Sequence, residues 1–304
     1  MTVAITKARF RVGEPIRNRS LTVFPLFSEP NGQVEYDLAD EAMRNKTLVV
    51  EEVSDSGSVP ELTVENRGDR RVLFIEGEEL LGAKQNRILN LTVLVPAGVK
   101  VTIPVSCIER GRWAFKSRTF GSGGRHSHSK LRHVLKSSVA RSAAAGGGHR
   151  SDQSAVWREV AAFNAMHYVK SPTDAISDAY EALASDVDEI RRQIQYVDGA
   201  VGAAVAVGKN IVAVDVFDKP ETCRKVWNRL LSGVTMDSLA AEDAEPSAEA
   251  ADVEALLAQV ESANWQPTPP VGEGQEYRAD IDTDQASALM FEDTLIHGSL
   301  VRAM

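Results

Sequence analysis

Cysteine is scarce in this chain of 304 residues, which contains only Cys107 and Cys223, far apart in the sequence. Two such cysteines are not a disulfide framework, and a reducing compartment is the simplest environment for them. Long apolar runs are also missing, because the longest, 201–207, is far too short to cross a bilayer. Residues 1–11 lack the apolar core of a signal peptide. These absences predict a cytoplasmic protein that contacts no membrane.

Familiar cofactor motifs are absent as well. The chain has no Walker-type loop and no G-x-S-x-G elbow, and the glycines at 121–124 lack the spacing of a dinucleotide fingerprint. His126 and His128 form a weak metal pattern without a nearby cysteine, so mobile, solvent-facing histidines are the better explanation. A metal-dependent hydrolase that uses both histidines with a glutamate is a distant alternative. We therefore expect neither a metal nor a cofactor.

Acidic residues are missing from one long segment. The whole chain has 34 Lys and Arg against 43 Asp and Glu, but residues 110–150 contain ten Lys or Arg and no acid. Such a stripe favours an anionic partner, which is a phosphate, a nucleotide, a nucleic acid or an acidic surface of the protein itself. A flexible, solvated connection explains it equally well. Sparse aromatic residues and the acidic remainder of the chain argue against nucleic acid.

The apolar pattern predicts an α+β fold in three regions. Residues 1–120 alternate like short, mainly antiparallel strands, with one helix at 38–44. Residues 121–150 are basic and rich in Gly and His, and we expect them to be flexible. Residues 151–304 begin with helices and end with strands, and we expect them to pack with 1–120 as one domain. The pattern indicates no particular oligomeric state.

Some elements have sharper signals. Helices are predicted at 151–168 and 174–195. A hairpin is predicted from 201–207 and 211–217, followed by a helix that starts near Pro220 and ends at Gly233. Terminal strands are expected at 286–291 and 295–302. Asp215 points opposite to the valines of its strand, so we expect it to face water, and Cys223 lies on the apolar stripe of its helix.

Two charged, turn-rich stretches, 76–87 and 107–113, are the best candidate for a site. Each lies beside a strand pattern that must be largely buried. Desolvating their charges is costly unless they pair with each other or with a ligand. The strands predicted at 89–95 and 99–107 should form an antiparallel hairpin, which would bring 85–87 close to 107–110. The two stretches are therefore predicted to form a single site.

The residue types of this site suit a phosphorylated nucleotide. Among Glu76, Glu78 and Glu79, the last two are our candidates for general acid and base, because neighbouring buried carboxylates raise each other's pKa. Phosphate is expected on arginines, and base or ribose on amides. The expected ligand contacts are Lys84, Gln85, Asn86, Arg87, Glu109, Arg110, Arg112 and Trp113. Internal salt bridges among these charged groups are the alternative.

Cys107 is the candidate nucleophile of the site, with Glu109 or a histidine as its partner. It is also the last residue on a strand face made of apolar side chains. A free cysteine on such a face is usually a small buried hydrophobic group. We therefore expect a structural cysteine and keep the nucleophile as the alternative.

The stretches 78–87 and 105–113 resemble a poorly characterised bacterial family, the ARG and rhodanese-phosphatase-superfamily-associated protein domain, where ARG denotes ADP-ribosylglycohydrolase. The segment 201–231 also fits, so the resemblance covers about residues 20–239. It implies a place in NAD or ADP-ribose metabolism, without an assigned reaction or catalytic residue. The leading hypothesis is a protein that binds or processes an NAD-derived or ADP-ribose-like nucleotide. The alternative is a non-catalytic module that sequesters a ligand or binds a partner, with its polar stretches as ion-pair networks.

Overall fold

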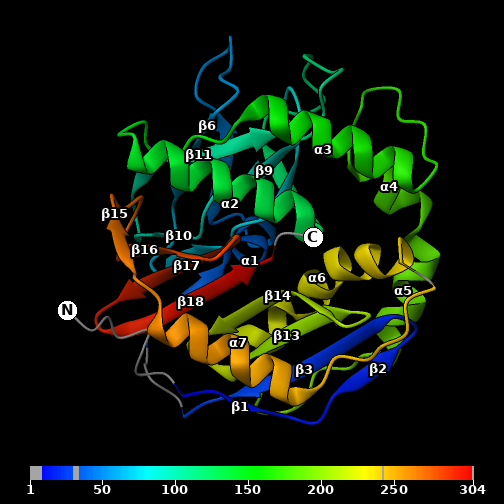
Figure 1. The fold of residues 1–304 in the computed structure, drawn as a ribbon. Coiled ribbons are helices and arrows are strands. Elements are labelled where there is room, and N and C mark those ends of the chain that lie inside the picture. Colours follow the sequence, from blue (N-terminus) through cyan, green and yellow to red (C-terminus); the bar gives the residue numbers. More distant parts are fainter. Residues whose placement is uncertain (1–8, 30–33, 242, 303–304) are drawn as a thin grey trace.

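A computed structural model describes residues 9–29, 34–241 and 243–302 of the chain. These residues form helices and three β-sheets, shown in Figure 1. Nearly all strand pairs are antiparallel, and the pair that joins 36–38 to 71–73 is parallel. The predicted α+β class is confirmed.

The largest sheet combines both ends of the chain. Its strands are β1 (Arg11–Val12), β2 (Ile16–Asn18), β3 (Leu21–Phe27), β13 (Gly202–Val207), β14 (Asn210–Phe217), β15 (Gln266–Thr268), β16 (Gln275–Ile281), β17 (Asp284–Phe291) and β18 (Thr294–Val301). Their order is β1-β3-β13-β14-β18-β17-β16-β15, and β2 pairs with β3. The predicted hairpin of β13 and β14 and the terminal strands β17 and β18 are confirmed.

Two smaller sheets come from the first half of the chain. One has the order β10 (Val93–Val95), β7 (Arg71–Phe74) and β4 (Tyr36–Leu38). The other has the order β12 (Phe120–His126), β8 (Glu78–Gly82), β9 (Arg87–Leu89), β11 (Lys100–Cys107), β6 (Glu61–Asn66) and β5 (Leu48–Glu52). Apolar side chains of both sheets, such as Phe74 and Ile103, share one core.

The hairpin predicted between 89–95 and 99–107 is only partly right. Strand β9 does pair with the end of β11, with Arg87 opposite Cys107. The chain then leaves this sheet, so β10 pairs with β7 and the start of β11 pairs with β6. The pairing of β9 with the end of β11, which joins the two polar stretches, is therefore confirmed.

Seven helices cover the sheets in the described part of the chain. They are α1 (Ala39–Arg44), α2 (Ser129–Ala144), α3 (Gln153–Met166), α4 (Ser177–Ala182), α5 (Ala184–Gln193), α6 (Pro220–Leu239) and α7 (Ala250–Ser262). Helix α6 packs on one face of the largest sheet and α7 on the other, whereas α2 and α3 pack on the side of β9 (Figure 1). None of these helices is long and apolar enough to span a membrane.

Most of the segment 121–150 forms regular structure, namely β12 and α2. His126 and His128 are 1% and 2% exposed, so the expectation of solvent-facing histidines is wrong. His126 Nε2 contacts the carbonyl oxygen of Glu76, and His128 Nε2 lies 3.1 Å from Glu159 Oε1. The ring of His128 stacks on Phe163 of α3, and the N–H of His126 donates to Ser232 of α6, so both histidines are buried against helices that come later in the chain.

Helix α6 runs through Gly233 instead of ending there. A Cβ atom built on Gly233 would lie 2.2 Å from the carbonyl oxygen of Ser127, far too close for a real contact. We expect Gly233→Ala to lower the free energy of unfolding by more than about 1 kcal/mol, because overpacking outweighs the better helix propensity of alanine. Urea unfolding measures the change. The control is Gly121→Ala, whose added Cβ atom meets no atom of the described residues within 4 Å. Equal stability of both variants would contradict the prediction.

Candidate functional site

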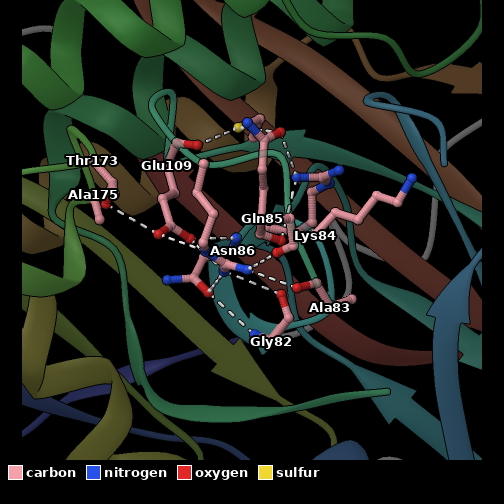
Figure 2. A network of polar contacts seen from close by, with 12 residues as sticks. Gly82, Ala83, Lys84, Gln85, Asn86, Glu109, Thr173 and Ala175 are labelled. Atoms are coloured by element: carbon pink, nitrogen blue, oxygen red, sulfur yellow. Dashed lines mark hydrogen bonds and ion pairs between the residues drawn. The ribbon is translucent and has the colours of Figure 1, made fainter. Parts of the chain in front are cut away.

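Strand pairing brings the two polar stretches together, as the sequence predicted. Strands β8 and β9 pair with each other, and the turn between them, 83–86, lies beside the end of β11. The thiol of Cys107 donates to Gln85 Oε1 at 3.1 Å, and the N–H of Ile108 donates to the carbonyl of Asn86 at 3.1 Å. Gln85 Nε2 reaches the carbonyl oxygen of Arg110 at 3.4 Å. Figure 2 shows Gln85 and Asn86 of this turn within a network of polar contacts that also includes Glu109.

Glu109 and Arg112 form a satisfied network at the centre of this region. Arg112 donates to both carboxylate oxygens of Glu109, at 2.8 and 2.6 Å, and to backbone carbonyls of the turn after β8. Glu109 also accepts from the N–H of Asn86 and the hydroxyl of Thr173 (Figure 2). Burial raises the pKa of Glu109, but hydrogen bonds from Arg112 and Asn86 outweigh it and lower the pKa. These contacts hold the loops together and leave few groups free for a ligand.

Cys107 is fully buried beside this network. Its thiol contacts Gln85 Oε1 and, at 3.4 Å, the carbonyl oxygen of Glu109. Burial raises the pKa of this thiol, so it is protonated near neutral pH. A thiolate is the reactive form of cysteine, and these surroundings therefore favour the structural role. Cys223 is likewise buried in α6, with its pKa raised by burial.

Glu78 and Glu79, the candidate acid and base, point to opposite faces of β8 because successive side chains of a strand alternate. Glu78 Oε1 lies 3.3 Å from Arg229 Nη1, and burial raises its pKa. Glu79 lies 4.0 Å from Arg125 Nε, and neither of its carboxylate oxygens has a hydrogen-bond partner among the described residues. Burial raises the pKa of Glu79 to about 7. The two carboxylates thus do not flank a common ligand position.

Arg87 has a different character from Arg112. Its side chain is completely buried, and Nη1 donates to the backbone and side-chain oxygens of Gln85 at 3.3 and 3.1 Å. Within the described part of the chain, Nε and Nη2 have no hydrogen-bond partner. The carboxylate of Glu52 lies 3.7 Å from Nη2. Burial lowers the pKa of this guanidinium. Two of its three nitrogens are thus buried without a hydrogen-bond partner among the described residues.

Aromatic rings lie above Arg87 and its neighbour Lys84. The ring centre of Trp113 is 5.8 Å from Arg87 Cζ and 5.2 Å from Lys84 Nζ, and that of Phe115 is 5.0 Å from Lys84 Nζ. Trp113 and Phe115 are 47% and 45% exposed. In Figure 2 the Lys84 side chain extends away from Glu109. We call Glu52, Lys84, Arg87 and Trp113 the loop cluster.

The predicted ligand contacts therefore divide into two groups. Lys84, Arg87 and Trp113 belong to the loop cluster, where donors and rings are available. The second group is Gln85, Asn86, Glu109 and Arg112. These residues mostly bind each other and the backbone around them, as the alternative of internal salt bridges expects. Arg110 stands apart, because its exposed guanidinium lies over the ring of Trp157 at 5.3 Å.

Sequence reasoning assigned Glu76 to the candidate site but missed the buried charges around it. We call Glu76, Arg132, Lys136, Asp215 and His297 the central ion cluster. Arg132 donates to both oxygens of Asp215 at 2.9 and 2.7 Å, and Lys136 Nζ lies 2.6 Å from Glu76 Oε2. Asp215 is 5% exposed, so the expectation that it faces water is wrong. The sequence held one signal for this cluster. Arg132 and Lys136 are four residues apart and therefore lie on one helix face, in a segment that has no acidic residue of its own to pair with them.

The fold and site define an α+β protein of antiparallel sheets whose buried charges are largely matched within the chain. The model of the ARG and rhodanese-phosphatase-superfamily-associated protein domain matches residues 9–301, and the chain belongs to this family. The resemblance found in the sequence is thereby confirmed, over a longer stretch than the motifs covered. No curated protein and no solved structure matches the chain.

Proposed function

We propose that this protein binds an NAD-derived or ADP-ribose-like phosphorylated nucleotide at the loop cluster. The observation that carries the proposal is the guanidinium of Arg87, which is completely buried while Nε and Nη2 lack hydrogen-bond partners among the described residues. Leaving such donors buried and unpaired is costly. Phosphate oxygens match the planar fork of a guanidinium and would supply the missing acceptors. The family's name, which joins it to ARG proteins, supports an ADP-ribose context.

Three members of the loop cluster and the neighbouring Phe115 have roles in this proposal. Arg87 and Lys84 neutralise phosphate, and the exposed rings of Trp113 and Phe115 stack on the base. Because Trp113 covers Arg87, the ligand reaches the guanidinium when this ring moves aside. The ring belongs to an exposed connection between β11 and β12, where such a movement breaks few contacts.

Binding is better supported than turnover. Glu78 and Glu79 face Arg229 and Arg125 rather than the loop cluster, and burial favours the protonated thiol of Cys107. The second candidate is a non-catalytic module that sequesters a ligand or binds a partner and whose polar stretches serve only as ion-pair networks. The contacts between Arg112 and Glu109 favour it for that part of the chain, but it does not account for the unpaired donors of Arg87.

A thermal-shift screen with ADP-ribose, NAD, AMP and inorganic phosphate tests the proposal first. We then expect Trp113→Ala to weaken binding of the best compound about tenfold or more, because stacking on a base contributes about 1–3 kcal/mol. Isothermal titration measures the affinity. Tyr168→Ala, which removes a ring that is 95% exposed elsewhere, is the control. The proposal fails when no nucleotide raises the melting temperature, and the stacking role fails when both variants bind like the wild type.

A further inference from the structure

Strand β5 ends in two glutamates that point to opposite faces. One of them is exposed to solvent, and the other is buried. The Glu51 side chain is 43% exposed, with its carboxylate 3.6 Å from Lys100 Nζ. The Glu52 side chain is 3% exposed and points into the loop cluster, beside Arg87. A buried carboxylate needs hydrogen-bond donors around both of its oxygens.

Among the described residues, a donor is present for only one oxygen of Glu52. Oε1 accepts from the backbone N–H of Lys84 at 3.3 Å and lies 3.7 Å from Arg87 Nη2. Oε2 is buried and has no hydrogen-bond partner among the residues that the structure describes. The carboxylate that carries this unused acceptor lies beside Arg87, because its other oxygen, Oε1, is 3.7 Å from the unpaired Nη2. A ligand that carries hydroxyl groups close to an anionic group would satisfy both.

Gly57 keeps a side chain out of this position. It has a positive φ of 76°, and a Cβ atom there would lie 3.3 Å from Glu52 Oε2 and 3.2 Å from a ring carbon of Trp113. The same Cβ would lie 3.3 Å from the Cδ atom of Lys84. Three members of the loop cluster thus meet around a glycine. A larger residue at Gly57 would crowd the free oxygen of Glu52.

We infer that Glu52 recognises ribose, with its carboxylate accepting hydrogen bonds from ribose hydroxyl groups while Arg87 holds the neighbouring phosphate. The inference rests on the nucleotide binding proposed above. An acidic side chain that accepts from a ribose hydroxyl is a recurrent solution in nucleotide-binding proteins. In a nucleotide the ribose hydroxyls and the phosphate are joined to the same sugar. A carboxylate and a guanidinium that lie 3.7 Å apart, as in Glu52 and Arg87, can therefore contact both groups of one ligand.

The test compares ligands with and without ribose hydroxyls on three proteins. Titration calorimetry is performed with ADP-ribose, AMP and 2′,3′-dideoxy-AMP, and with ribose 5-phosphate and 2-deoxyribose 5-phosphate. We expect the wild type to prefer the hydroxyl-bearing member of at least one pair by about tenfold or more, as hydrogen bonds to a charged group do. Glu52→Gln should lose this preference and keep its affinity for the deoxy compound. Glu51→Gln, the exposed neighbour, should behave like the wild type.

The outcomes separate this inference from the proposed function. When the wild type binds none of the compounds, the proposed function and the role of Glu52 both fall. When the wild type binds but Glu52→Gln keeps the preference, or weakens both members of a pair equally, the ribose role alone is overturned. If Glu52→Gln does not fold, Glu52→Asp replaces it. This variant keeps the charge but withdraws the carboxylate, and it should lose the same preference.

Discussion

Glu76→Ala is expected to lower the free energy of unfolding by about 3–5 kcal/mol, because it leaves the buried ammonium of Lys136 without its counter-charge. Glu76 is 3% exposed, and its carboxylate lies 2.6 Å from Lys136 Nζ and 3.4 Å from Arg132 Nη2. Hydroxyl groups of Ser287 and Ser299 donate to the same carboxylate at 3.0 and 3.2 Å. Burial alone would raise the pKa of Glu76, yet Lys136 and Arg132 lower it to about 2, so the group is ionised at neutral pH.

Urea unfolding at pH 7 measures this loss as a shift of the midpoint. The control is Glu51→Ala, which removes an exposed partner of Lys100 and should cost less than about 1 kcal/mol. A second variant, Glu76→Gln with Lys136→Met, removes both charges of the pair and should be more stable than Glu76→Ala. A loss below about 1 kcal/mol in Glu76→Ala would show that the central ion cluster does not depend on this carboxylate.

The central ion cluster also shows where sequence reasoning reaches its limit. Alternation correctly placed Asp215 on the face of β14 opposite to its valines. It did not reveal that α6 packs on that face, or that α2 brings Arg132 against Asp215. In a sheet covered on both sides, the polar face of a strand is buried too. Which element covers it depends on contacts far apart in the sequence, which local patterns do not record.

The loop cluster was found only in part for the same reason. The sequence predicted that Lys84, Arg87 and Trp113 lie in one region, because alternation predicted the pairing of β9 with β11. Glu52 comes from β5, which joins the same sheet through β6 and β11, so its position depends on two further pairings. Nothing in the local sequence distinguishes Glu52 from the adjacent Glu51. The candidate site was thus predicted where its neighbours are local and missed where they are distant.

The pKa of Glu79 predicts an unusual dependence of stability on pH. Burial raises this pKa, Arg125 lowers it only in part, and the folded-state value is about 7 against an ordinary 4.5. Between these values the folded protein holds a proton that the unfolded chain has released. Stability therefore falls as the pH rises through this window and levels off above pH 7. The penalty at pH 8 is about 3 kcal/mol, from about 1.4 kcal/mol for each pKa unit.

Glu79→Gln removes the titrating group while keeping the shape of the side chain. Below pH 4, where Glu79 is protonated in both states, we expect the variant to match the wild type. At pH 8 it should be more stable by about 3 kcal/mol, because the wild type must then bury a carboxylate without a hydrogen bond. Urea unfolding at pH 4, 6 and 8 measures the difference. Glu181→Gln, whose carboxylate is also 4.0 Å from Arg125 but is 68% exposed, should show no such trend. A variant that is less stable than the wild type at pH 8 would mean that Arg125 compensates the ionised Glu79, and that this carboxylate is charged in the folded protein at neutral pH.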